Sequence, residues 1–411
     1  MRGSWSGQAT ATGVLAAFVG FASSFAVIIQ GLSAVGATPA QAASGLMALS
    51  LAMGIAGIWL SLRSGLPISI AWSTPGAALL ATTGAPDGGF AAAVGAFLFS
   101  GALIVIAGLW KPFGRAVASI PAPLANAMLA GVLLGLCLAP VKAVAATPLL
   151  GLAIVLAWAL VGRFRRLFAV PAAVLVAVVL IVATQPLGGI TWDTLLPAPV
   201  LVRPSFSIGA IVGIGLPLFI VTMASQNIPG MAVLNVNGDH PAPGPLFRAT
   251  GIFSLLAAPF GGHAVNLAAI TAALCAGPDA HPDPARRWWA AVVTGCTYIL
   301  FGLAAGGAAV LISVAPPILI EAVAGLALLG AFGSALVGAV TGPQDREAAA
   351  ITFLVTASGL SFFGISGAFW GLVAGGAMLA WTRWRRPACA AASAAASRPP
   401  AGPSCLARAR R

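Results

Sequence analysis

The sequence predicts an all-α polytopic membrane protein with 14 transmembrane segments. Of the 411 residues, 60% are hydrophobic and only 7% are charged, and the mean hydropathy is +1.02. Soluble domains carry about 25% charged residues, so the composition excludes a soluble enzyme and a disordered chain. The second observation is a series of apolar runs long enough to cross a bilayer, which takes roughly 20 helical residues. The third is a strong asymmetry of basic residues between these runs.

Twelve of the segments are expected to be continuous or nearly continuous helices. Because neighbouring helices can satisfy freed backbone groups, the 50 glycines and 30 prolines do not argue against them. No cleavable signal peptide is expected, since the first apolar run leads into a full-length span. The twelve helices are expected at residues 11–32, 41–62, 90–110, 121–139, 147–162, 167–185, 207–228, 245–259, 286–307, 317–340, 347–362 and 366–384.

The third segment, within residues 63–87, is expected to be interrupted. Residues 66–73 are predicted to be extended. A half-helix is predicted to follow, with Ser73 or Thr74 as its N-cap and Pro75 at its first position.

The tenth segment, within residues 248–279, is expected to be interrupted in the same way. Its uncharged run is too long for one span and too short for two. Two adjacent glycines break it, residues 263–266 are predicted to be extended, and a short helix is predicted over 267–276 with Asn266 as N-cap. Interrupted spans of this kind mark binding sites in transporters.

The basic residues predict the orientation in the membrane. Of the 20 Lys and Arg, the 14-segment arrangement leaves only Lys142 and Arg203 outside, with both termini in the cytoplasm. Residues 1–10 then form a cytoplasmic tail, and residues 386–411 form a disordered one. Despite the net charge of +12, nucleic-acid binding is not expected, because the basic residues form no face.

Weak self-similarity at an offset of 192 to 194 residues predicts two repeats, residues 11–188 and 205–385. The two interrupted segments are then equivalent, and Thr74 corresponds to Asn266. Seven segments per repeat is an odd number, so the second repeat is inverted in the membrane. The same logic predicts a core domain from segments 1–4 and 8–11 and a gate domain from segments 5–7 and 12–14.

Three stretches resemble the benzoate:proton symporter (BenE) family of bacteria. They are AWSTPGA at residues 71–77, QNIPG at 226–230 and PFGGHAVNLAAIT at 259–271. The resemblance covers about residues 8–385. It implies import of benzoate or a related aromatic carboxylate with a proton across the bacterial inner membrane. It also implies the fold of uracil/xanthine permeases and sulfate-type anion transporters, and a possible homodimer by analogy.

The sequence departs from the nucleobase permeases of that fold, which carry membrane-embedded glutamates at their site. Glu321 is its only acidic residue near a span, which argues against a proton relay made of carboxylates. An anion site without charged groups is expected instead, between the N-termini of the two half-helices. The alternative is that the small residues there only allow tight helix packing.

Polar and aromatic side chains near these half-helices are the other candidates. Gln226 and Asn227 contact either the substrate or the neighbouring segments. His263 either carries the coupled proton or is a neutral histidine that stabilises the extended strand. Trp72 either stacks on an aromatic ring or is a core residue. The predicted substrate-binding residues are Trp72, Ser73, Thr74, Pro75, Gly76, Ala77, Gln226, Asn227, Val265, Asn266, Leu267, Ala268, Gln30, Phe25 and Phe219.

No catalytic residue, metal or cofactor is expected. The sequence has no zinc-binding or paired acidic motif and no nucleotide-binding loop, so an integral-membrane enzyme and an ATP-driven pump are disfavoured. The cysteines show no paired spacing. The expected partners are the aromatic carboxylate, the proton and the lipid bilayer, with Arg286 and Arg287 anchoring lipid headgroups. An anion channel or exchanger, or a transporter of a nucleobase or an inorganic anion, are the alternatives.

Overall fold

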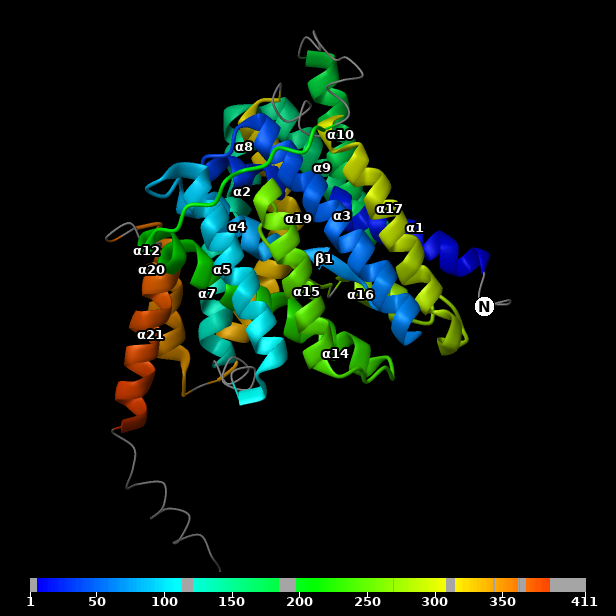
Figure 1. Cartoon of the computed structure of the whole chain (residues 1–411). Helices are drawn as coiled ribbons and strands as arrows, with labels where there is room; N and C mark the ends of the chain where they lie inside the picture. Colours follow the sequence, from blue (N-terminus) through cyan, green and yellow to red (C-terminus); the bar gives the residue numbers. More distant parts are fainter. Residues whose placement is uncertain are drawn as a thin grey trace, which may run out of the picture.

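Helices make up most of the chain in this computed structural model (Figure 1). The structure describes residues 6–112, 121–184, 197–268, 270–307, 315–342, 344–360, 362 and 367–384. The predicted C-terminal tail 386–411 and residues 1–5 of the predicted N-terminal tail lie outside these residues.

The helices of the first half follow the predicted segments closely. Helix α3 begins with a capping box in which Thr38 and Gln41 exchange hydrogen bonds, and it ends at Gly65 in the left-handed region. The helices are α1 (Gly7–Ala22), α2 (Phe25–Ala34), α3 (Pro39–Ser64), α4 (Thr74–Thr83), α5 (Gly89–Leu109), α7 (Ala122–Cys137), α8 (Ala139–Ala146), α9 (Pro148–Phe164) and α10 (Ala169–Thr184).

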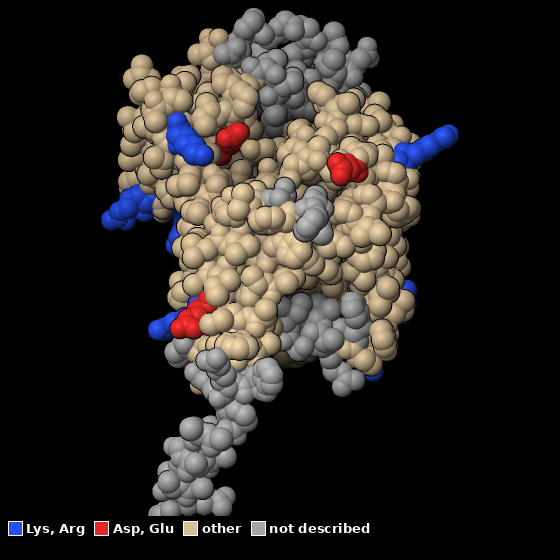
Figure 2. Space-filling view, turned by 90° about the vertical axis from the view of Figure 1, so that its left-hand side faces the viewer, with Lys and Arg blue, Asp and Glu red and all other residues tan. Residues whose placement is uncertain are grey.

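The second half is built in the same manner. Its helices are α12 (Ile208–Ala210), α13 (Leu216–Thr222), α14 (Ile228–Val236), α15 (Pro243–Ala257), α16 (Ile270–Ala276), α17 (Trp288–Leu303), α19 (Pro317–Val340), α20 (Arg346–Ala357) and α21 (Gly367–Trp384). Among the described residues, six helical stretches are long and apolar enough to cross a membrane: Gly7–Ala34, Pro39–Ser64, Gly89–Leu109, Ala122–Ala146, Ile208–Val236 and Pro317–Val340. Figure 2 shows few charged side chains on one face, many of them toward its edges, with a broad uncharged surface between them.

The first predicted span is not one helix. It breaks between α1 and α2 at Ser23 and Ser24, whose hydroxyls both donate to the carbonyl of Gly20, over 3.1 and 3.0 Å. Serine hydroxyls compete with backbone amides for carbonyls, which favours a break. The indole Nε1 of Trp72 donates to Ser24 Oγ over 2.8 Å and joins the break to the third segment.

The eighth segment contains two π-helical turns, Ile211–Gly215 and Met223–Asn227, which join α12, α13 and α14 into one stretch. Each turn ends two residues before a proline, Pro217 or Pro229. A proline lacks an N–H and its ring displaces the carbonyl four residues earlier, and the wider π turn accommodates that displacement. Because of these turns the helix continues to Val236, beyond the predicted end at residue 228.

Two short strands, β1 (Ile70–Trp72) and β2 (Val265–Leu267), pair antiparallel near the middle of the molecule (Figure 1). Ala71 lies opposite Asn266. The prediction that Asn266 is a helix N-cap is therefore wrong, because it lies in β2 and α16 begins at Ile270.

Two further hydrogen bonds extend the ladder and reveal its symmetry. Ser73 N donates to Ala264 O, and Ala268 N donates to Ser69 O, each over 3.0 Å. The two bonds are related by a shift of 195 residues, because position 69 plus 195 is 264 and position 73 plus 195 is 268. The shift therefore turns one bond into the other. The predicted correspondence of Thr74 with Asn266 is thus displaced by three residues. Identities between Ala- and Gly-rich stretches arise by chance and do not fix a register.

The helices pack around these strands in two groups. Helix α3 packs against α17, α5 against α15, and α2 against α4. In the other group α7 packs against α19 and α20, and α9 packs against α10. The largest cluster of buried apolar residues includes both strands and the inner faces of α2 to α5.

Candidate functional site

Ser73 occupies the junction between β1 and α4 and connects several elements. Its Oγ accepts hydrogen bonds from Gly76 N over 3.1 Å and from Thr222 Oγ1 of α13 over 2.9 Å. The first bond caps α4, so Ser73 is the N-cap of the two candidates that the sequence left open, and Pro75 is the second helical residue rather than the predicted first. Ala77 N donates to Ser73 O, and Pro75 has no N–H, so most N-terminal donors of α4 are already used. Thr74 is the residue of this turn whose N–H and hydroxyl have no partner among the described residues.

His263 lies behind this junction and is fully buried. Its Nε2 lies 2.9 Å from Ser73 O, and since a carbonyl oxygen only accepts, Nε2 carries the hydrogen. The other ring nitrogen, Nδ1, has no hydrogen-bond partner among the described residues. The ring meets Phe97 edge-on, with 6.3 Å between centroids. The geometry therefore fixes the tautomer and leaves one buried acceptor position open.

The two predicted asparagines hold the strands rather than line a cavity. Asn227 Oδ1 accepts from Leu267 N over 2.9 Å, and its Nδ2 donates to Met223 Sδ. With the amide of Asn266 oriented to satisfy both of its ends, Oδ1 accepts from Ser73 N and Nδ2 donates to Leu267 O, each over 2.9 Å. Both side chains are fully buried, as expected for polar groups that replace missing backbone bonds.

A cavity of about 60 Å³ lies where the break between α1 and α2 meets β1, the start of α4 and the approach to α16. Four of the predicted residues line it: Trp72, Thr74, Gln226 and Ala268. Gln226 belongs to the second π turn, a feature that is frequent at functional sites. No charged side chain lines the cavity within the described part of the chain.

The other predicted residues lie outside the lining of this cavity. Gly76 packs on α13, where a Cβ would lie 2.5 Å from Leu218 Cδ1, so tight packing explains this glycine. Phe25 stacks on Phe21, with ring centroids 5.6 Å apart, and Phe219 belongs to an apolar cluster near α5. Gln30 lies on α2, and its Oε1 is buried without a hydrogen-bond partner among the described residues. Ser73, Pro75, Ala77, Asn227, Val265, Asn266 and Leu267 are buried around the strands.

The structure brings in residues that the sequence did not single out. Tyr298 of α17, Thr271 of α16, and Ser23 and Ser24 also line the cavity, and Thr271 Oγ1 lies 2.8 Å from Ser69 Oγ. Two signals were available: Tyr298 is the single tyrosine of the chain, and the serine pair interrupts an apolar span. A polar group inside a span is costly, which makes it a candidate for function.

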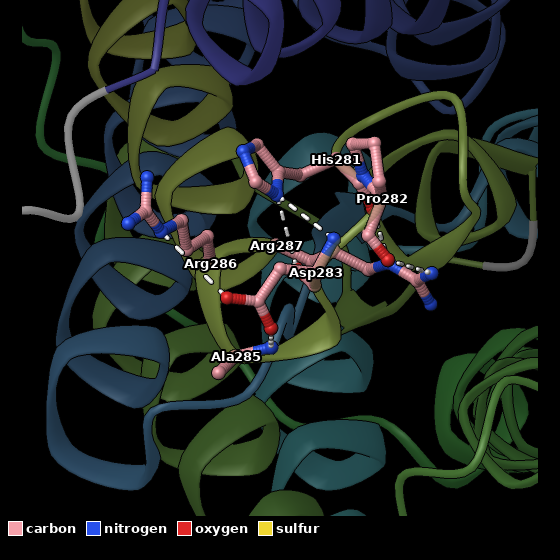
Figure 3. Close-up of polar contacts among 6 residues, drawn as sticks. All are labelled: His281, Pro282, Asp283, Ala285, Arg286 and Arg287. Carbon is pink, nitrogen blue, oxygen red and sulfur yellow. Dashed lines mark hydrogen bonds and ion pairs between the residues drawn. The ribbon is translucent and has the colours of Figure 1, made fainter.

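The loop from α16 to α17 corrects one prediction (Figure 3). Arg287 is 8% exposed, and its guanidinium donates to the carbonyls of His281 and Pro282 and, over 2.9 Å, to that of Ala276 at the end of α16. It therefore caps the half-helix instead of anchoring a lipid headgroup. Arg286, in contrast, is exposed and lies 3.7 Å from Asp283.

Comparison with known proteins gives the family. Residues 4–381 match the family described as "Benzoate membrane transport protein" (BenE). The chain belongs to this family. The match covers more than nine-tenths of the chain, so the resemblance inferred from the three motifs is confirmed. The family is one of membrane transporters, and the chain is a membrane protein.

Two relatives of this BenE chain cover nearly its whole length. "Inner membrane protein YdcO" of Escherichia coli (strain K12) is 41% identical over 367 residues, which are 89% of this chain and 93% of the relative. "Benzoate membrane transport protein" of Acinetobacter baylyi is 33% identical over 381 residues, 93% and 96% of the two chains.

Solved structures show which fold the BenE chain adopts. The transmembrane domain of a cyanobacterial bicarbonate transporter, BicA, superposes with a TM-score of 0.57 at 15% identity, over 92% of this chain and 96% of that one. The murine Solute Carrier 26 family member A9 anion transporter, in the inward-facing state, superposes with a TM-score of 0.54 at 13% identity, over 92% of this chain and 68% of that one. The BenE chain thus has the fold of these anion transporters. Its motif at residues 259–271 contains β2, and its motif at 71–77 begins within β1, so both motifs meet at the paired strands beside the cavity.

Proposed function

We propose that the chain is a secondary active transporter that imports benzoate or a related aromatic carboxylate with a proton, by alternating access. The observation that carries this is the cavity, because Thr74 and Ala268, at the approaches to α4 and α16, both line it. The carboxylate is held between the N-terminal ends of these two half-helices. Family membership supports the substrate class.

The chemistry of the lining suits a single negative charge. It contains hydroxyls and an amide as donors, including Thr74 and Gln226, and no carboxylate among the described residues to repel an anion. Helix N-termini add a partial positive charge. The Thr74 N–H and hydroxyl, free of other partners, are the donors on the α4 side. An anion can therefore be held without a cationic side chain.

The aromatic ring requires the cavity to widen. A cavity of about 150 Å³ accepts benzene, whereas this one measures about 60 Å³. The indole of Trp72 is one wall, tied to Ser24 across the break between α1 and α2. Movement of these segments relative to each other opens the space, which is the change that alternating access requires.

The organisation into fourteen segments, arranged as two inverted repeats of seven, is part of the proposal. Helices α3, α5, α15 and α17 belong to segments 2, 4, 9 and 11. A shift by seven segments therefore turns the α3–α17 contact into the α15–α5 contact, and both contacts are present. It likewise exchanges α1–α16 with α13–α4. The shift of 195 residues that exchanges the strand hydrogen bonds supports the same symmetry. The two groups of packed helices correspond to a core that moves against a gate.

His263 is the proposed proton carrier. Its Nδ1 is a buried acceptor without a partner among the described residues, and its Nε2 bonds to the residue that caps α4. A proton on Nδ1 would add positive charge near the proposed carboxylate site, so that proton and anion favour each other's binding.

Uptake of radiolabelled benzoate into proteoliposomes with an alkaline interior tests the function. We expect accumulation above that of empty liposomes, which corrects for free diffusion of benzoic acid, and its collapse with a protonophore. Gln226→Ala should abolish most of the protein-dependent uptake. Gln344→Ala is the matched control, because Gln344 is an exposed glutamine that does not line the cavity.

Other outcomes identify the alternatives. Benzoate flux that ignores the pH gradient would contradict symport and indicate a channel or exchanger. Protein-dependent uptake of bicarbonate or uracil, with none of benzoate, would contradict the substrate class and leave the fold assignment intact.

A further inference from the structure

An apolar groove runs between α3 and α15, separate from the cavity described above. Its wider part has a volume of about 660 Å³ and is lined by Arg63 and Trp59 of α3 and by Arg248 of α15, among others. Its narrower part has a volume of about 250 Å³. Both parts share Ile55 and Phe253, so they form one continuous groove.

The polar groups of the groove are confined to one end. Arg63 and Arg248 are exposed, and neither forms an ion pair with the described residues. The guanidinium of Arg63 lies 5.8 Å from the ring centroid of Trp59, which holds it at the mouth of the groove. The narrower part is lined by apolar side chains alone. The complementary ligand therefore has an anionic head and an apolar chain.

The dimensions fit one leaflet of a bilayer. From Arg63 to Met47, at the far end of the groove, α3 rises by about 24 Å. Half of a bilayer core is about 15 Å thick, so the groove accommodates an acyl chain from its headgroup to the midplane. Ile55, Ile252 and Leu256 are 48%, 48% and 61% exposed, as expected for a face that contacts lipid chains.

We propose that this groove binds one anionic phospholipid of the cytoplasmic leaflet. Its phosphate pairs with Arg63 and Arg248, whose planar guanidinium groups suit phosphate oxygens. One acyl chain lies along the groove past Ile55 and Phe253. The distribution of basic residues predicts that this end of α3 faces the cytoplasm, where the membrane surface is negative.

The test is a lipid-retention experiment on the purified full chain. The protein in detergent is incubated with equal amounts of phosphatidylglycerol and phosphatidylcholine of matched acyl chains, and native mass spectrometry gives the ratio bound. We expect phosphatidylglycerol to be preferred, and the preference to fall roughly 30-fold in R63Q/R248Q. The control R163Q/R165Q removes the same charge at the end of α9 and should keep the wild-type ratio.

A second variant tests the apolar part of the groove. Ile252→Trp fills it and keeps both arginines, so retention of long-chain phosphatidylglycerol should fall while the thermal unfolding temperature stays that of wild type. Equal retention by R63Q/R248Q and its control would overturn the proposal. If R63Q/R248Q loses phosphatidylglycerol but Ile252→Trp retains it, the proposal would also be overturned. The two arginines would then bind an anionic group without an acyl chain in the groove. A detergent-stable dimer that Ile252→Trp dissociates would show that a second copy occupies the face.

Discussion

The imidazole Nε2 of His263 donates a hydrogen bond to the carbonyl oxygen of Ser73 over 2.9 Å, although 190 residues separate them in sequence. Ser73 caps α4, and His263 precedes β2. The bond therefore joins the start of one half-helix to the strand that leads to the other.

Replacement of Ser73 should destabilise this junction. Ser73→Ala removes the cap of α4 and the acceptor for Thr222 Oγ1, so we expect a loss of about 1–2 kcal/mol in a reversible unfolding titration. Thr222→Val should cost less when added to Ser73→Ala than when made alone, because both remove the same hydrogen bond. Ser33→Ala, at the exposed end of α2, should change stability by less than about 0.5 kcal/mol. Additive effects would contradict the shared bond.

Substitution of His263 separates its two proposed roles. His263→Gln keeps a donor for Ser73 O but removes the titratable nitrogen. We expect it to keep benzoate exchange across a membrane without a gradient and to lose accumulation driven by a pH gradient. His263→Phe removes the donor as well and should lower both activities. If His263→Gln accumulates benzoate like wild type, His263 is a structural residue.

A methyl group at Gly20 should obstruct the cavity. A Cβ there would overlap the hydroxyl of Tyr298 and lie 3.0 Å from Thr271 Cγ2. The added methyl narrows a cavity that already has to widen for an aromatic ring, so we expect roughly tenfold or greater weakening of benzoate uptake in Gly20→Ala, equivalent to about 1.4 kcal/mol of binding free energy. Gly7→Ala, on the same helix with open space around it, is the control. Tyr298→Phe added to Gly20→Ala should restore part of the uptake. Wild-type uptake by Gly20→Ala would place the substrate elsewhere.

Removal of the Arg287 guanidinium should loosen the end of α16. Arg287→Gln leaves carbonyls of Ala276, His281 and Pro282 without their donor, so a loss of about 2–3 kcal/mol in unfolding is expected (Figure 3). Arg286→Gln should cost less than about 0.5 kcal/mol, because its contact with Asp283 is exposed to solvent. Equal effects of the two variants would contradict the capping role.

The helical segments were predictable because their signal is local and repeated. Apolar length and proline position placed the start of the helix at Pro317 correctly and that of α3 to within two residues. The start of α4 followed from Pro75 and the hydroxyl residues before it, although the sequence did not choose between Ser73 and Thr74 as the cap. Such features depend on neighbours in the sequence, so no tertiary information is needed.

The break in the first span and the register of the strands were not predictable in this way. Ser23 and Ser24 compete for the carbonyl of Gly20, but two serines in an apolar span do not by themselves decide where a helix breaks. The hydrogen bond that Trp72, from another segment, donates to Ser24 stabilises the break there. Hydrogen bonds between segments far apart in the chain relate the two strands by a shift of 195 residues, whereas sequence identity suggested 192, with Thr74 corresponding to Asn266. Asn227 and Gln226 are adjacent in sequence, but Asn227 bonds to β2 and Gln226 lines the cavity, which depends on the segments packed on each side of the helix.

The sequence by itself determined that this chain lies in a membrane, that its two interrupted segments are special, and which family it resembles. These properties rest on composition, on helix-breaking residues and on local motifs, which are written in neighbouring residues. Only the tertiary structure decided which polar groups satisfy the backbone and which remain open. Which polar groups are satisfied depends on the hydrogen-bond partners that distant segments supply. Both ends of the Asn266 amide have such partners, whereas Thr74 faces the cavity.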